Sequence, residues 1–213
     1  MSLTLYFHPL SSYCHKALIA LYENGTPFTP QKVDLMDAVQ SAAFKQIWPM
    51  GKFPVLRDGD RVVPESTTII EYLAARHPGG ARLIPTDLTA ANAVRAADRF
   101  YDLHVHTHMQ KIVGDRLRPA DKRDTYGAEQ ARGLLDTALG LADKEMAGRQ
   151  WVVGEDFSLA DCAAAPALFY ADMAVAPIAG FPNLSAYLAR VKRRPSYARV
   201  LAEAEPYLKY VPR

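Results

Sequence analysis

The spacing of apolar residues changes abruptly at His77-Pro78-Gly79-Gly80. Before this point, short apolar runs typical of strands alternate with stretches of helical spacing. After it, the chain shows only helical periodicity and the residues that begin and end helices. The sequence therefore predicts a small α/β domain over residues 1–77, a linker over residues 78–87, and an all-helical domain over residues 88–213.

The first domain is predicted to have the element order βαβ followed by ββα, in one mixed four-stranded sheet. Its first two strands are joined by a helix, so they should be parallel with a right-handed crossover. The turn Asp58-Gly59-Asp60 indicates an antiparallel hairpin. The expected strands cover 3–7, 28–35, 53–56 and 61–63, and the expected helices cover 12–23, 38–48 and 65–76. In the second domain, helices are expected over 90–117, 121–147, 159–175, 184–194 and 197–204.

Charge and cysteine content exclude several classes of protein. The formal net charge of the 213 residues is +2, and the basic residues are scattered, so no nucleic-acid surface is expected. The two cysteines are too few for a disulfide-stapled secreted scaffold. The most apolar stretch, 163–178, is interrupted by Asp172 and by prolines, so no membrane span is expected. A cytoplasmic location is the default expectation.

Reactive side chains stand at the first strand–helix junction, in Ser11-Ser12-Tyr13-Cys14. A helix N-terminus stabilises a thiolate, and redox proteins place Cys-x-x-Cys at such a junction. Here a hydroxyl occupies the position of the attacking thiol. Serine cannot be a redox nucleophile, but it can donate a hydrogen bond to a thiol that arrives with a ligand. The alternative is that Ser11 or Ser12 only caps the helix.

Two further segments have binding potential. Pro54 begins a strand after a glycine turn, and a cis bond there would expose the backbone of Phe53 to an extended peptide. The alternative is an ordinary edge-strand proline. Glu65 and Ser66 lie where a helix is expected to begin, and free N–H groups at that end bind carboxylates. Helix capping is the alternative for this pair.

In order and spacing, these segments resemble the glutathione transferase family, and the resemblance covers essentially the whole chain. It rests on Pro9-x-Ser11-Ser12, on Gly51-Lys52-Phe53-Pro54-Val55 and on the stretch from Glu65 to Leu73. In the second domain, it rests on Gly154-x-x-Phe157-Ser158-Leu159-Ala160-Asp161. That last segment resembles the family's capping box, with Ser158 as N-cap, Asp161 at N3 and Phe157 packed on Cys162, and its role would be in folding.

The resemblance implies a thioredoxin-like first domain and an enzyme that conjugates glutathione, its co-substrate, to a hydrophobic electrophile. Ser11 would activate the thiol, as in the theta, delta and zeta classes. Ser12, where the beta class places a cysteine, is the first alternative, and Tyr6, by analogy with tyrosine-type classes, is the second. The implied contacts of glutathione are the backbone of Phe53 before a cis Pro54, Glu65 and Ser66 for the γ-glutamyl end, and Lys52 for the glycyl carboxylate. A homodimer is also implied.

The electrophile pocket is expected to be formed by Leu10, Tyr13, Tyr101, His104 and His108, between the two domains. On a regular helix, His104 and His108 share a face while His106 points nearly opposite, so no metal site is expected. Phe169, Tyr170 and Met173 are expected either to form an apolar wall of this pocket or to pack in the core. Cys14 is expected to be a buried apolar residue rather than a redox group.

Two departures from the family pattern leave the class open. Trp48 stands where many relatives have Asn, and His15-Lys16 replaces the usual Arg. The alternative activities are those of a glutathione-dependent isomerase, a dehalogenase or a disulfide-bond reductase. From a different class, the alternative is a non-catalytic binding protein with the transferase fold.

Overall fold

The first part of the chain forms a four-stranded mixed sheet. In this computed structural model, which describes residues 3–175 and 178–212, the strand order is β2-β1-β3-β4. Strand β1 (Leu3–Phe7) pairs in parallel with β2 (Phe28–Lys32) and antiparallel with β3 (Val55–Asp58), which pairs antiparallel with β4 (Arg61–Pro64). The predicted element order and the thioredoxin-like fold class are therefore confirmed.

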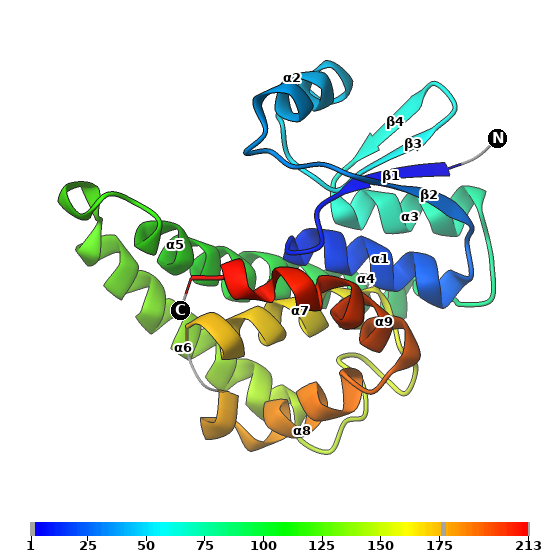
Figure 1. The fold of residues 1–213 in the computed structure, drawn as a ribbon. Coiled ribbons are helices and arrows are strands. Elements are labelled where there is room, and N and C mark those ends of the chain that lie inside the picture. The colour runs from blue at the N-terminus through cyan, green and yellow to red at the C-terminus, as the bar shows by residue number, and fades with distance from the viewer. Residues whose placement is uncertain (1–2, 176–177, 213) are drawn as a thin grey trace.

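Helices cover the two faces of this sheet unequally (Figure 1). α1 (Ser12–Asn24) and α3 (Ser66–Arg76) lie side by side on the face that meets the helical domain. α2 (Ala38–Ile47) lies alone on the opposite face. Successive side chains along each strand point to opposite faces of the sheet. Both faces therefore carry apolar side chains, which the helices on each side cover.

The apolar residues of the sheet divide in the same way. Leu3, Leu5 and Phe7 of β1 belong to the main core, which continues through α1 into the second domain. On the α2 face, a separate small cluster consists of Val33, Phe44 and Val55, which are buried. Tyr6, which alternates with Leu5 and Phe7, packs against this second cluster.

The rest of the chain is helical, as expected. The stretch predicted as one helix over 90–117 is built from three segments in succession, of which the middle one is π-helical. They are α4 (Leu88–Phe100), the π-helical turn Tyr101–His106, and α5 (Thr107–Arg116). The remaining helices are α6 (Thr125–Met146), α7 (Leu159–Ala174), α8 (Pro182–Val191) and α9 (Pro195–Ala204), followed by a 3₁₀ segment at Glu205–Tyr210. α7 is the most buried of these helices and packs against α1, α4 and the π-helical turn.

Most element ends lie within a few residues of their predicted positions. β2 ends at Lys32 rather than at residue 35, and β3 begins at Val55, after the proline. α3 begins at Ser66, so Glu65 precedes the helix instead of forming its first turn. Within the described residues, no helix is long and apolar enough to cross a membrane.

Candidate functional site

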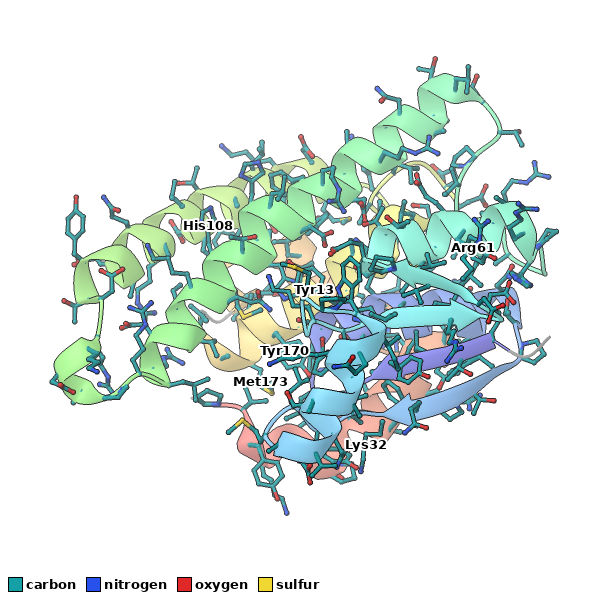
Figure 2. The ribbon with its side chains drawn as sticks, turned by 90° about the horizontal axis from the view of Figure 1, so that it is seen from above. Tyr13, Lys32, Arg61, His108, Tyr170 and Met173 are labelled. Carbon is teal, nitrogen blue, oxygen red and sulfur yellow. The ribbon has the colours of Figure 1, made fainter. Side chains whose placement is uncertain are left out.

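A pocket of about 700 Å³ lies between the sheet domain and α4–α5. From the first domain, it is lined by the start of α1, the segment before β3 and the start of α3. Figure 2 shows Tyr13 at this junction of the two domains, whereas Arg61 lies away from it on the sheet. The lining includes the following predicted site residues: Tyr13, Lys52, Phe53, Pro54, Glu65 and Ser66.

The segment before β3 has the geometry that the sequence indicates. The Phe53–Pro54 peptide bond is cis. The Phe53 ring packs on the small cluster beneath α2, 6.4 Å from the Phe44 ring. This packing anchors the side chain, so the backbone of Phe53 is held at the edge of the pocket, where an extended peptide can pair with it.

The N-terminus of α3 opens into the same pocket. Glu65 occupies the N-cap position with φ 67° and ψ 124°, a conformation rarely adopted by residues other than glycine. Its side chain makes no capping hydrogen bond, so the first N–H groups of the helix have no partner from the cap residue. Ser66 follows as the first residue of the helix and is buried. Free N–H groups at the positive end of a helix suit a carboxylate ligand.

The two candidate serines have different surroundings. Ser11 is the N-cap of α1, and its Oγ accepts a hydrogen bond from the backbone N–H of Cys14 at 3.3 Å. Because Ser11 acts there as an acceptor, its own hydroxyl hydrogen remains available for donation. Ser12 is 6% exposed, and its Oγ lies 2.5 Å from Nε2 of His106. Neither serine belongs to the pocket lining in the part of the chain that the structure describes.

Tyr13 connects the start of α1 with the helical domain. Its ring stacks on that of His106, with centroids 4.0 Å apart and planes inclined by 14°. Burial, and then the negative charge of Asp102, raise the pKa of Tyr13 to about 12. Its hydroxyl is therefore a protonated hydrogen-bond donor across the physiological pH range. Burial also lowers the pKa of His106 to about 3, so this imidazole is neutral.

Beneath the pocket lies a network of charges that sequence reasoning missed. Lys16 Nζ is 2.5 Å from Asp98, 2.8 Å from Asp102 and 2.8 Å from the hydroxyl of Thr67. Arg99, which is half exposed, also contacts both carboxylates and Thr67. The sequence held one signal of this network, a lysine within the apolar pattern of a helix, but it did not identify the partners 82 and 86 residues away.

Tyr6, the second alternative for thiol activation, does not line the pocket. Its ring lies 6.0 Å from Phe44, on the sheet face covered by α2. The physical reason is strand alternation, which places Leu5 and Phe7 on the α1 side and Tyr6 on the other.

The residues expected to form the electrophile pocket are largely placed elsewhere. Tyr101 is 3% exposed within the main core, so it does not face the cleft. His104 is exposed, with its ring 5.6 Å from that of Phe100, and neither it nor His108 lines the pocket. Leu10 is likewise absent from the lining in the described residues. Of the expected set, only Tyr13 lies at the pocket.

The pocket wall contributed by the second domain is polar and charged rather than apolar. Phe169, Tyr170 and Met173 lie on α7 and are packed into or against the main core instead of lining this pocket. The wall is formed by Arg95, Asp98, Arg99, Asp102, Leu103, Thr107 and Gln110.

Neither cysteine is placed for redox chemistry. Cys14 and Cys162 are free and fully buried, and burial raises the pKa of Cys14 to about 12. Cys14, the last residue of the Ser11-Ser12-Tyr13-Cys14 stretch, is therefore a protonated thiol inside the core. Across residues 3–175 and 178–212, no group of three or more histidine, cysteine, aspartate or glutamate side chains could hold a metal ion.

The capping box at the start of α7 is present as the sequence indicates. Asp161 accepts hydrogen bonds from the backbone N–H of Ser158 at 3.0 Å and from the Ser158 hydroxyl at 3.2 Å. The same carboxylate also accepts from the N–H of Val152 and the hydroxyl of Tyr187, each at 3.0 Å. It therefore joins α7 to the preceding loop and to α8.

Comparisons with known proteins point to one family. Residues 5–81 match the family model for the N-terminal domain of glutathione S-transferase, and residues 100–195 match that for its C-terminal domain. Glutathione S-transferase theta-2 of Rattus norvegicus is 30% identical over 209 residues, which cover 90% of this chain and 81% of that protein. A stringent starvation protein A homolog of Haemophilus influenzae is 28% identical over 210 residues, covering 96% and 92%.

A solved structure gives the same relationship in three dimensions. It is a glutathione S-transferase of Methylobacillus flagellatus with GSH bound, and its TM-score against this chain is 0.86. The sequence identity is 30%, and the match covers 93% of this chain and 98% of that one.

Proposed function

This chain belongs to the glutathione S-transferase family, and we propose that it ionises the thiol of glutathione with the Ser11 hydroxyl. The thiolate would then attack an electrophilic carbon and form a thioether. The observation that carries this proposal is the difference between the two serines. Ser11 is partly exposed and only accepts from the Cys14 N–H, whereas Ser12 is buried and its Oγ lies 2.5 Å from Nε2 of His106.

One hydroxyl is sufficient for this ionisation. A free thiol titrates near pH ~8.5. A hydrogen bond to a charged acceptor contributes about 1.5–3 kcal/mol, and one pKa unit corresponds to ~1.4 kcal/mol, so Ser11 could lower the thiol pKa by roughly one to two units. The N-terminus of α1 adds ~0.3–1 kcal/mol. The bound thiol would therefore be largely ionised near neutral pH.

The pocket offers complementary groups for the rest of glutathione. We propose that the backbone of Phe53, before the cis Pro54, pairs with the cysteinyl unit. Glu65 and Ser66 would bind the γ-glutamyl end, with its carboxylate at the uncapped N-terminus of α3 and its ammonium group at the Glu65 carboxylate. Lys52 lines the same pocket and would meet the glycyl carboxylate. A tripeptide held in this way would have its sulfur close to the start of α1.

Ser11→Ala tests the assignment directly, with Ser12→Ala as the matched control. The pKa of bound glutathione is measured from its thiolate absorbance in the ultraviolet. We expect Ser11→Ala to raise this pKa by roughly one to two units, and Ser12→Ala to raise it much less. The reverse ranking would transfer the role to Ser12. Failure of the wild-type protein to bind immobilised glutathione would contradict the proposal as a whole.

A second candidate function is that of a binding protein without catalysis. It is favoured by the position of Ser11 outside the pocket lining. Retention on immobilised glutathione without turnover of dinitrochlorobenzene, and without the isomerase, dehalogenase or reductase activities, would support this candidate. Turnover that depends on Ser11 would exclude it.

The electrophile and the assembly are part of the proposal. The polar second-domain wall indicates an electrophile that carries polar groups next to its reactive carbon, in addition to the expected hydrophobic part. A homodimer is proposed from family membership, and sedimentation equilibrium would measure it. The cytoplasmic location stays a prediction.

A further inference from the structure

The loop that carries Ser11 contains one peptide group that two histidines hold from opposite ends. This group is the carbonyl of Pro9 with the N–H of Leu10. The carbonyl oxygen of Pro9 lies 2.6 Å from Nε2 of His15. The N–H of Leu10 donates to Nδ1 of His8 at 3.2 Å. Both polar atoms of the Pro9–Leu10 peptide, one residue before Ser11, are therefore bonded to imidazoles.

These contacts determine where each imidazole carries its hydrogen. A carbonyl only accepts, so Nε2 of His15 must be the protonated nitrogen. An N–H only donates, so Nδ1 of His8 must be the bare one. Nδ1 of His15 has no partner among the described residues, which agrees with a neutral ring protonated at Nε2. Protonation of His8 at Nδ1 would break its bond to Leu10.

Each histidine is itself fixed by aromatic neighbours in a different part of the fold. His15 is fully buried, with ring centroids 5.4 Å from Tyr170 of α7 and 6.2 Å from Tyr197 of α9. The His8 ring stacks at 6.1 Å on Phe53, next to the cis proline, and meets Tyr207 edge-on at 5.5 Å. The peptide group is thus connected to the helical domain on one side and to the Phe53 segment on the other.

We propose that His8 and His15 are positioning residues for thiol activation, because together they orient the Pro9–Leu10 peptide and thereby the Ser11 hydroxyl. This inference rests on the proposed function of Ser11. The Ser11 N–H also donates to the carbonyl of His8 at 3.0 Å, so the loop closes on itself. A hydroxyl that must meet an incoming sulfur needs its position fixed to about 0.5 Å, and a loop reaches that precision only when its backbone is held.

Electrostatics supports the neutral state of both rings. Burial lowers the pKa of His15 to about 4. Burial also lowers the pKa of His8, against the opposing effect of Asp34. Both imidazoles therefore keep the hydrogen arrangement that the peptide requires at neutral pH.

The test uses amide side chains that reproduce one imidazole nitrogen each. In His8→Asn, the amide oxygen can replace the Nδ1 acceptor, whereas His8→Phe keeps the aromatic stacking and removes the acceptor. In His15→Gln, the amide N–H can replace the Nε2 donor, whereas His15→Leu removes it. Each conservative variant is the matched control for its disruptive partner.

The readout is the thiol pKa of bound glutathione together with kcat and KM. For His8→Phe and His15→Leu, we expect the thiol pKa to rise by about one unit, which is about a tenfold loss of thiolate at neutral pH. We expect kcat to fall in parallel and KM for glutathione to change less. His8→Asn and His15→Gln should stay close to the wild type. If His8→Phe and His15→Leu lower the thermal stability but leave the thiol pKa unchanged, the proposal is overturned.

A measurement on the unaltered protein keeps the proposal testable if His15→Leu does not fold. Nitrogen-15 NMR of the imidazoles should show His8 and His15 as neutral rings protonated at Nε2. A hydrogen on Nδ1 of either ring would overturn the proposal. If Ser11→Ala raises the thiol pKa while the histidine variants do not, only the positioning role fails. If wild-type enzyme binds glutathione without ionising it, the proposed function of Ser11 fails first.

Discussion

Lys16 Nζ lies 2.5 Å from Oδ1 of Asp98, and both side chains are only 1% exposed. Lys16 belongs to α1 of the first domain, and Asp98 belongs to α4 of the second. Both charges are removed from water, so each needs nearby opposite charge, which the pair supplies together with Asp102 and Arg99. The ion pair therefore makes the contact between the domains specific, directly below the pocket.

Replacing this lysine should be far more damaging than replacing an exposed cation. We expect Lys16→Met to lower the free energy of unfolding by about 3 kcal/mol, because Asp98 and Asp102 would remain buried with only the half-exposed Arg99 as a cation. Arg95, which pairs with Glu71 on the surface, is the matched control, and Arg95→Met should cost about 1 kcal/mol or less. Chemical denaturation measures both. Equal losses would contradict the role assigned to burial.

The Asp161 carboxylate should be essential for folding rather than for chemistry. Asp161→Ala leaves the donors of Val152, Ser158 and Tyr187 without their acceptor. Each unsatisfied buried group costs about 1–3 kcal/mol, so we expect a total loss of at least ~3 kcal/mol. The exposed Asp156 on the preceding loop gives the control variant Asp156→Ala, expected within about 0.5 kcal/mol of wild type. A small loss in Asp161→Ala would show that water replaces the carboxylate.

Glu65 should show opposite effects on stability and on binding. Its φ of 67° is unfavourable for a residue with a Cβ, so Glu65→Gly should stabilise the fold by about 1 kcal/mol. The same variant loses the carboxylate at the pocket, and we expect glutathione to bind about tenfold more weakly, since 1.4 kcal/mol is a factor of ten. Glu65→Gln separates the two effects, because it retains the Cβ and removes the charge. Thermal unfolding and titration calorimetry give the two quantities.

Acid should destabilise the protein through its buried histidines. Burial lowers the pKa of His15 to about 4 and that of His106 to about 3, below the ~6.5 of an unfolded histidine. The folded state then binds fewer protons, so this stabilisation is present above pH ~6.5 and is lost as the pH falls towards the folded values. Near pH 5, each of these histidines contributes ~1.4 kcal/mol per pH unit to the slope of unfolding free energy.

The slope is measured by denaturant titrations at several pH values. His15→Gln has no titrating ring, so it should reduce the slope by the equivalent of about one proton. An unchanged slope would mean that His15 is already protonated in the folded protein.

The elements that the sequence predicts well are those set by local chemistry. Strand alternation, the glycine turn before Pro54 and the capping box at Ser158 each depend on a few neighbouring residues, and each is found in the structure. The family comparisons agree with the same segments. Short-range patterns were therefore enough for the fold and for one side of the pocket.

The residues that line the second side of the pocket differ from those expected, because no local pattern shows which face of α4 and α5 meets the first domain. The sequence-based expectation placed Tyr101, His104 and His108 on a helix face turned toward the cleft. The residues that do line the pocket, Arg99, Leu103 and Thr107, follow one another at intervals of four residues through the π-helical turn. Tyr101 turns into the core and His106 reaches Ser12. Contacts such as Lys16 with Asp98 depend on helix packing across the whole chain, which no local pattern contains.

The isolation of α2 on its own face of the sheet has a consequence for motion. Only Phe44 of this helix is buried, and Met36 and Val39 near its start are largely exposed. Amide protons of α2 should therefore exchange with solvent through local opening, long before those of α7. Lys52 and Phe53 lie in the segment that connects α2 to β3, so such opening would loosen one wall of the pocket while the core stays intact. Entry and release of a tripeptide could thus proceed through the least stable part of the molecule.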